Sequence, residues 1–175
     1  MSPRLLTVVT EDWYFRLHWL TLARTAAEKG WDVTVATRIN KPEHAEAIAA
    51  AGLRLIPLAL DRSSLNPLRE WAAVGALTEM YRREKPDLIH HVALKPVLYG
   101  SLAAKRAGVP HWLNGLPGLG YVYASDEPKA RLLRPLIGGM FRLLLNDRRS
   151  RVLLQNHDDA RFFANGIVAP ERVHC

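Results

Sequence analysis

The chain has 175 residues and a formal charge of +7, with 24 lysines and arginines against 17 acidic residues. Its hydrophobic content of 49% allows one buried core, and no run approaches the ~20 apolar residues of a membrane span. The single cysteine, Cys175, excludes an internal disulfide and a cysteine metal cluster, so we expect a cytoplasmic location and no metal site. The positive charge favours an acidic partner, which could be a phosphate, a nucleic acid or a membrane surface.

Predicted strands alternate with predicted helices along the whole chain. Short apolar or β-branched runs indicate strands, and amphipathic or alanine-rich runs that end near glycine indicate helices. The strands are expected at 5–10, 31–37, 53–58, 88–92, 111–114, 151–155 and 172–175, and the helices at 13–29, 42–51, 68–85, 96–107, 129–145 and 158–164. This order predicts an α/β fold with a doubly wound, Rossmann-like parallel sheet of about seven strands and helices on both faces.

Polar residues follow the ends of the first and fourth predicted strands. Glu11 and Asp12 follow the first strand, His90 and His91 end the fourth, and Lys95 begins the next helix. The carboxyl edge of a parallel sheet is the usual place for a ligand. A lysine beside free helix N–H groups also favours an anion there. We therefore predict a binding site at this edge, with Asp12, His90 and His91 as candidate catalytic residues.

Each of these residues also has a purely structural interpretation. Glu11 and Asp12 could cap the following helix, and His18 could be a partly buried histidine rather than part of the edge. His90 and His91 should point to opposite faces of their strand, so only one is expected to line the site. A solvated Lys95 would need no bound anion. Gly118 and Gly120, after the fifth strand, could allow close approach to a ligand or serve turn geometry alone.

Several familiar nucleotide and hydrolase motifs are absent from the sequence. The first predicted turn, 10–15, has no glycine, so a dinucleotide fingerprint is excluded there, and neither a P-loop nor a G-x-S-x-G elbow is present. No nucleic-acid recognition motif appears either, and we expect no nucleic-acid partner.

The predicted helix 129–145 combines bulky apolar residues with Lys129, Arg131, Arg134 and Arg142. Such a helix can lie on an anionic membrane. The same pattern also suits a helix that packs on the sheet with solvated arginines. Both interpretations stay open at this point.

Four stretches of the chain resemble the N-terminal domain of GT-B glycosyltransferases of family 4, especially bacterial enzymes that build lipid-linked surface polysaccharides. They are the opening strand–helix–strand, GLRLIPLALDRSSLNPLRE, PDLIHHVALKPVLYGSLAAKRAGVP and NGLPGLGYVY. In the third stretch, His90, Lys95 and Gly100 match the family pattern H-x4-K-x4-G. The chain departs from the family in lacking the early glycine-rich turn, and Val92 stands where a second histidine often follows.

The resemblance implies that residues 1–175 form a single acceptor-binding domain, one half of a GT-B enzyme whose C-terminal donor-binding domain is absent here. It implies a retaining glycosyltransferase, inactive as this fragment alone. The enzyme would use a UDP- or GDP-sugar and no other cofactor, and a polyprenyl-diphosphate-linked or other glycan acceptor, at the inner membrane face as a peripheral protein. The acceptor residues would be Glu11, Asp12, His18, His90, His91, Lys95, Gly118 and Gly120. The membrane-facing residues would be Lys129, Arg131, Arg134 and Arg142.

Two other functions stay open. One is half of a GT-B UDP-sugar 2-epimerase, which would act on a soluble nucleotide-sugar. The other is a non-enzymatic α/β ligand-binding or regulatory domain.

Overall fold

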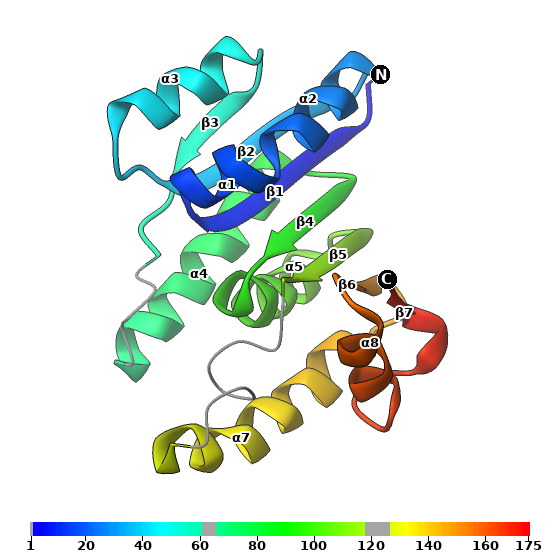
Figure 1. The fold of residues 1–175 in the computed structure, drawn as a ribbon. Coiled ribbons are helices and arrows are strands. Elements are labelled where there is room, and N and C mark those ends of the chain that lie inside the picture. Colours follow the sequence, from blue (N-terminus) through cyan, green and yellow to red (C-terminus); the bar gives the residue numbers. More distant parts are fainter. Residues whose placement is uncertain (1, 61–65, 118–126) are drawn as a thin grey trace.

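The computed structural model describes residues 2–60, 66–117 and 127–175. Its centre is a parallel sheet of seven strands in the order β3-β2-β1-β4-β5-β6-β7 (Figure 1). The strands are β1 (Arg4–Glu11), β2 (Asp32–Arg38), β3 (Arg54–Pro57), β4 (Leu88–Val92), β5 (His111–Leu116), β6 (Ser150–Leu154) and β7 (Val173–His174). The predicted α/β class and parallel, doubly wound sheet are confirmed.

The helices cover both faces of this sheet, and the alternation of side chains along each strand decides which face they meet. Val9 of β1 packs with Phe15 and Ile48, whereas Leu6 and Val8 of the same strand pack in the cluster that contains Leu77 and Tyr81. One face is therefore covered by α1 (Asp12–His18), α2 (Leu20–Glu28) and α3 (Pro42–Ala50), and the other by α4 (Pro67–Glu84) and α5 (Ser101–Ala107).

A third buried cluster closes the β5–β7 end of the sheet. Here α7 (Pro128–Leu145) and α8 (His157–Ala164) pack against each other and against β5 and β6, with Phe141 and Phe163 in ring contact at 5.2 Å. Asn156 caps α8, since its side chain accepts a hydrogen bond from the backbone N–H of Asp159. A short helix, η2 (Pro170–Arg172), leads into β7.

The predicted helix 13–29 is two helices, because Trp19 leaves helical geometry with φ −123° and ψ −12°. Its indole packs edge-on against the ring of His90, with ring centroids 4.7 Å apart. The predicted strand 111–114 continues to Leu116, so Gly115 is a strand residue and lies beside Val92. Both differences shape the surroundings of β4, through the indole of Trp19 at His90 and the backbone of Gly115 at Val92.

The predicted helix 96–107 begins with a π-helical turn, η1 (Pro96–Gly100), before α5. Ala93 precedes it with a φ of 78°, a left-handed conformation that is unusual for a residue other than glycine. Gly100 lies against the imidazole of His91, where a β-carbon would overlap the ring. Strained backbone and π-helical turns concentrate at functional sites, and both occur here directly after β4.

Candidate functional site

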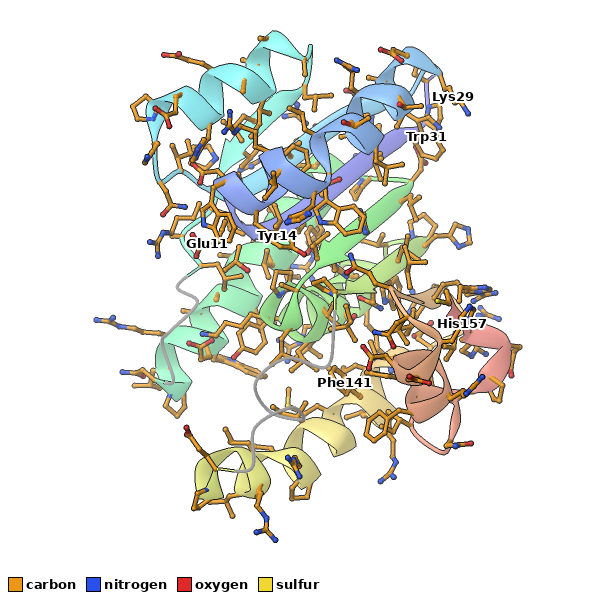
Figure 2. All side chains as sticks on the ribbon, in the orientation of Figure 1. Glu11, Tyr14, Lys29, Trp31, Phe141 and His157 are labelled. Atoms are coloured by element: carbon orange, nitrogen blue, oxygen red, sulfur yellow. The ribbon has the colours of Figure 1, made fainter. Side chains whose placement is uncertain are left out.

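The carboxyl ends of β1, β4 and β5 meet at one edge of the sheet, and the candidate residues of the first two strands lie there. Figure 2 shows Glu11 and Tyr14 together where β1 passes into α1, whereas Lys29 and Trp31 lie at the opposite edge. The register places His90 between Thr7 of β1 and Leu113 of β5. His90 is therefore level with Thr7, four residues before Glu11 along β1, and a shared binding site for these residues stays a prediction.

His90 is buried, with 5% of its surface exposed, and turns toward α1 and α2. Its Nε2 atom has no hydrogen-bond partner among the described residues. A β-carbon on Gly115 would stand 3.0 Å from that nitrogen, so the glycine leaves the space that the ring needs. Burial lowers the pKa of His90 to about 4, and the ring is therefore neutral near pH 7. A buried nitrogen without a partner can form a hydrogen bond with a ligand that reaches it.

His91 turns to the opposite face, as its position next to His90 predicts, and all its hydrogen-bonding capacity is used. Its Nδ1 lies 2.9 Å from Oδ1 of Asn114, and its Nε2 lies 3.0 Å from the hydroxyl of Tyr81. The amide oxygen can only accept, so Nδ1 carries the proton and Nε2 accepts from Tyr81. Burial, opposed by the Asn114 bond, lowers the pKa of His91 to about 3. Its geometry is that of a core residue.

Asn114 joins this pair to the rest of the core. It accepts from Ser101 at 3.0 Å and donates to Ser150 at 2.9 Å. The network therefore ties β4 and β5 to α4, α5 and the start of β6. A fully satisfied buried network of this kind fixes one arrangement of the elements around it.

Asp12 is fully buried and its two carboxylate oxygens are occupied. Oδ1 accepts from the backbone of Trp13 at 2.7 Å, and Oδ2 accepts from the backbone of Asn40 at 2.7 Å and of Lys41 at 3.3 Å. Nδ1 of His44 lies 3.2 Å from Oδ1, at ion-pair distance but without hydrogen-bond alignment. Burial acts to raise the pKa of Asp12, but the hydrogen bonds from Asn40, Lys41 and Trp13 together outweigh it and lower the pKa to about 2.

Asp12 thus anchors the segment between β2 and α3 and makes no side-chain cap on α1. Glu11, next to it, is half-buried, and its Oε2 accepts from Nδ2 of Asn40 at 2.7 Å. The described residues offer no partner to its Oε1. Of the two acids, Glu11 is the one with an oxygen available to a ligand.

Lys95 lies inside the first turn after Ala93 and already has an anion beside it. Its Nζ is 3.0 Å from both carboxylate oxygens of Glu70, and both side chains are mostly buried. The ring of Tyr99 lies 5.8 Å from the same ammonium group. Burial, followed by the hydrogen bond and charge of Glu70, raises the pKa of Tyr99. The cation at this helix start therefore has a protein counter-ion, which the sequence alone did not indicate.

His18 is exposed on α1, with its ring stacked at a tilt on Tyr14 at 4.5 Å. It lies six residues after the start of α1, about 9 Å along a helix of standard rise. Within the described part of the chain its ring contacts Tyr14, which is not one of the candidate residues. Gly118 and Gly120 lie outside the described residues, so their predicted role at the acceptor site stays a prediction.

The helix α7 has two apolar faces. Ile137, Phe141 and Leu144 are buried in the core, while the opposite face carries exposed leucines at helical spacing, namely Leu132 (78%), Leu136 (61%) and Leu143 (72%). Arg131 and Arg142 are exposed as well, although Nε of Arg142 donates to the carbonyl of Gly166 at 2.8 Å. Arg134 is half-buried, and the side chain of Lys129 lies outside the described part. Core packing and an exposed apolar face are therefore combined in one helix.

Among residues 2–60, 66–117 and 127–175, no group of three or more His, Cys, Asp or Glu side chains is arranged to hold a metal ion. Within the same residues, no helix has the length and apolarity needed to pass through a bilayer.

Sequence reasoning missed Trp19, Asn40 and Glu70 as neighbours of this edge. Asn40 and Glu70 are polar residues of a kind common on any surface, and their partners lie 25 to 29 residues away in the chain. Asn40 follows the carboxyl end of β2 and was overlooked there, whereas Glu70 lies within α4, which a pattern restricted to strand ends does not cover.

Comparison with known proteins shows the family and the fold of the chain. A model of the glycosyl transferase 4-like family matches residues 4–156. The chain is 28% identical over 127 residues to N,N'-diacetylbacillosaminyl-diphospho-undecaprenol alpha-1,3-N-acetylgalactosaminyltransferase of Campylobacter jejuni. The aligned residues make up 73% of this chain and 34% of that protein. The chain thus spans about a third of this curated relative's length.

Solved structures share the fold at low sequence identity. Sucrose-phosphate synthase from Thermosynechococcus elongatus superposes with a TM-score of 0.67 at 13% identity, covering 98% of this chain and 47% of that one. A glycosyltransferase from Rickettsia africae superposes with a TM-score of 0.63 at 11% sequence identity, and the match covers 99% of this chain and 42% of that one. UDP-GlcNAc 2-epimerase from Neisseria meningitidis superposes with a TM-score of 0.62 at 13% sequence identity, and the match covers 97% of this chain and 45% of that one. In each case the chain corresponds to less than half of the other protein.

Proposed function

The chain belongs to the glycosyl transferase 4-like family, and we propose that it is the acceptor-binding half of a retaining glycosyltransferase. The full protein would move a sugar from a UDP- or GDP-sugar to a polyprenyl-diphosphate-linked acceptor in surface polysaccharide synthesis. The donor would be held mainly by protein outside these 175 residues. The name of the Campylobacter relative, whose acceptor is a diphospho-undecaprenol sugar, supports this choice of acceptor class.

The observation that carries the acceptor site is the buried, neutral imidazole of His90 with an unpartnered Nε2. A neutral imidazole nitrogen can accept a hydrogen bond from a sugar hydroxyl or donate one to its oxygen, depending on the tautomer. Glu11 adds an open carboxylate oxygen at the same edge. Lys95 adds positive charge, and an acceptor diphosphate would share it with Glu70. These are the groups that we propose bind the acceptor.

The exposed face of α7 supports a peripheral position on an anionic membrane. Its leucines 132, 136 and 143 lie on one side of the helix, and the segment from 128 to 145 contains four basic residues and no acidic one. Such a face gains free energy both from burying apolar area at the lipid boundary and from attraction to anionic headgroups. It would bring the acceptor site to the surface where a polyprenyl lipid is found.

The test uses the full-length protein with UDP- and GDP-sugars and a short-chain polyprenyl-diphosphate-linked monosaccharide. Mass spectrometry should detect a disaccharide product, and NMR of the new linkage should show the anomeric configuration of the donor. His90→Leu should raise the acceptor KM, whereas His157→Gln, at an exposed histidine of α8, should not. Absence of transfer with every donor, or a product of inverted configuration, would contradict the proposal.

A UDP-sugar 2-epimerase is the second candidate, favoured by the superposition on the Neisseria enzyme. It requires no lipid-linked acceptor. Conversion of UDP-GlcNAc by the full-length protein without any added acceptor would select it.

A further inference from the structure

Asn40, which lies between β2 and α3, has an amide whose orientation is fixed by contacts on both sides. Its Oδ1 accepts from Nε of Arg38 at 3.1 Å. Its Nδ2 therefore faces the acids, and donates to Oδ1 of Asp12 at 2.8 Å and to Oε2 of Glu11 at 2.7 Å. The backbone N–H of Asn40 is held by Asp12 as well, at 2.7 Å. One rigid amide thus reaches both acids at the carboxyl end of β1.

Glu11 depends on this amide for its orientation. Asn40 is the hydrogen-bond partner that the described residues offer to the Glu11 carboxylate, and the contact uses Oε2 alone. A glutamate side chain has three rotatable bonds and loses considerable rotamer freedom when it is fixed. With Oε2 held, Oε1 keeps a defined position at the sheet edge.

We propose that Asn40 is a positioning residue that holds Glu11 so that Oε1 accepts a hydrogen bond from a hydroxyl of the acceptor sugar. The inference rests on the proposed function and refines it. An ionised carboxylate only accepts hydrogen bonds, so its ligand must be a donor such as a hydroxyl or amide N–H. A diphosphate would be repelled by Glu11 and by the ionised Asp12 next to it. The sugar therefore binds at the β1 end of the site, and the diphosphate binds away from it.

The first test is a double-mutant cycle in the full-length protein, with Asn40→Ala, Glu11→Ala and the double variant. The acceptor is a farnesyl-diphosphate-linked N-acetylhexosamine, and KM for acceptor and donor is measured for each. Asn40→Ala should raise the acceptor KM about tenfold, the usual size for a lost hydrogen bond to a charged group, with the donor KM unchanged. In the Glu11→Ala background, Asn40→Ala should have no further effect on the acceptor KM.

A purely structural role for Asn40, exerted through Asp12, gives a different result. Asn40→Ala would then raise the acceptor KM by the same factor whether or not Glu11 is present. Alternatively, it would lower kcat and the thermal midpoint and leave the acceptor KM unchanged. Either result would overturn the proposal. Asn165→Ala, at an exposed asparagine after α8, is the control for loss of an asparagine side chain.

A second measurement separates this inference from the proposed function. In a crystal structure of Asn40→Ala, the Glu11 carboxylate should occupy several rotamers or leave its wild-type position. An unchanged, single Glu11 conformer would overturn the positioning role whatever the activity. If the full-length protein shows no sugar transfer at all, the proposed function fails, and this structural result alone decides whether Asn40 positions Glu11.

Discussion

The imidazole of His91 fills the space in which Gly100 would carry its β-carbon. The ring is held there from both sides, by Asn114 through Nδ1 and by Tyr81 through Nε2, so it has no room to withdraw. This contact makes the π-helical turn Pro96–Gly100 and the end of β4 one packed unit.

Replacing Gly100 by alanine should therefore destabilise the domain. The added methyl group meets a fixed, fully buried ring, and overpacking of this kind costs about 1–3 kcal/mol. Urea denaturation of the domain should show the loss as a lower midpoint. Gly75→Ala and Gly139→Ala are matched controls, because both glycines are helical and a β-carbon there meets nothing within 4 Å. These two changes should be neutral or stabilising, since alanine favours helix. An equal loss in all three variants would contradict the argument.

The stability of the domain should fall as the pH drops below about 6.5, the ordinary pKa of histidine. The folded-state pKa is lowered to about 4 for His90 and to about 3 for His91. The unfolded chain therefore binds protons that the folded one does not. Each histidine contributes up to about 1.4 kcal/mol of lost stability per pH unit, beginning near 6.5 and ending at its own folded pKa.

Urea titrations at several pH values measure this slope. The variant His90→Gln keeps a polar side chain but does not titrate in this range, so its slope between pH 6 and 4.5 should be shallower than that of the wild type. A slope unchanged by the substitution would mean that His90 is protonated in the folded protein.

The pair formed by Lys95 and Glu70 should show strong coupling. Both side chains are mostly buried and Nζ contacts both carboxylate oxygens, so loss of either partner leaves a poorly solvated charge. Lys95→Met and Glu70→Gln should each lower the free energy of unfolding, with a coupling energy of about 1–3 kcal/mol in the double-mutant cycle. The exposed pair Arg82 and Glu79 on α4 is the control and should couple by less than about 1 kcal/mol. Additive losses for Lys95 and Glu70 would show that the pair contributes nothing.

Membrane binding by α7 should depend on both its leucines and its basic residues. In vesicle sedimentation with phosphatidylglycerol-containing liposomes at low salt, the triple change of leucines 132, 136 and 143 to serine should reduce partition at least about tenfold, given the apolar area removed. Changing Lys129, Arg131 and Arg134 to glutamate should abolish it. Leu68→Ser, at a leucine of α4 that is 82% exposed, is the matched control. Vesicle binding that is unchanged by salt and by both sets of substitutions would contradict membrane binding through α7.

The sequence was sufficient to predict the alternating order of strands and helices and the parallel sheet. These features follow from local periodicity. The opposite orientation of His90 and His91 was predicted for the same reason, because neighbouring strand residues alternate.

The side-chain partners at the edge could not be predicted in this way. Whether Asp12 faces Asn40, or Lys95 faces Glu70, depends on how far each helix is shifted along the sheet, and local pattern does not contain that shift. The break at Trp19 and the π-helical turn are likewise features of tertiary contact, since the residues at 13–29 and 96–107 are compatible with continuous helices. The features that could not be predicted are therefore those that depend on contacts between different helices and strands.

The order of the strands also has a consequence for the synthesis of the protein. β1 pairs with β2 on one side and with β4 on the other, and Leu5 lies opposite Leu88. At elongation rates of ~5–20 residues per second, the ribosome needs roughly 2.5 to 10 s to add the 50 residues between the end of β2 at Arg38 and the start of β4 at Leu88. Through that interval the nascent chain presents one unpaired edge of β1, whose residues 6–10 are buried in the folded domain, and such an edge can pair with another chain. Protection of this edge by a chaperone should therefore matter most while residues 38–88 emerge.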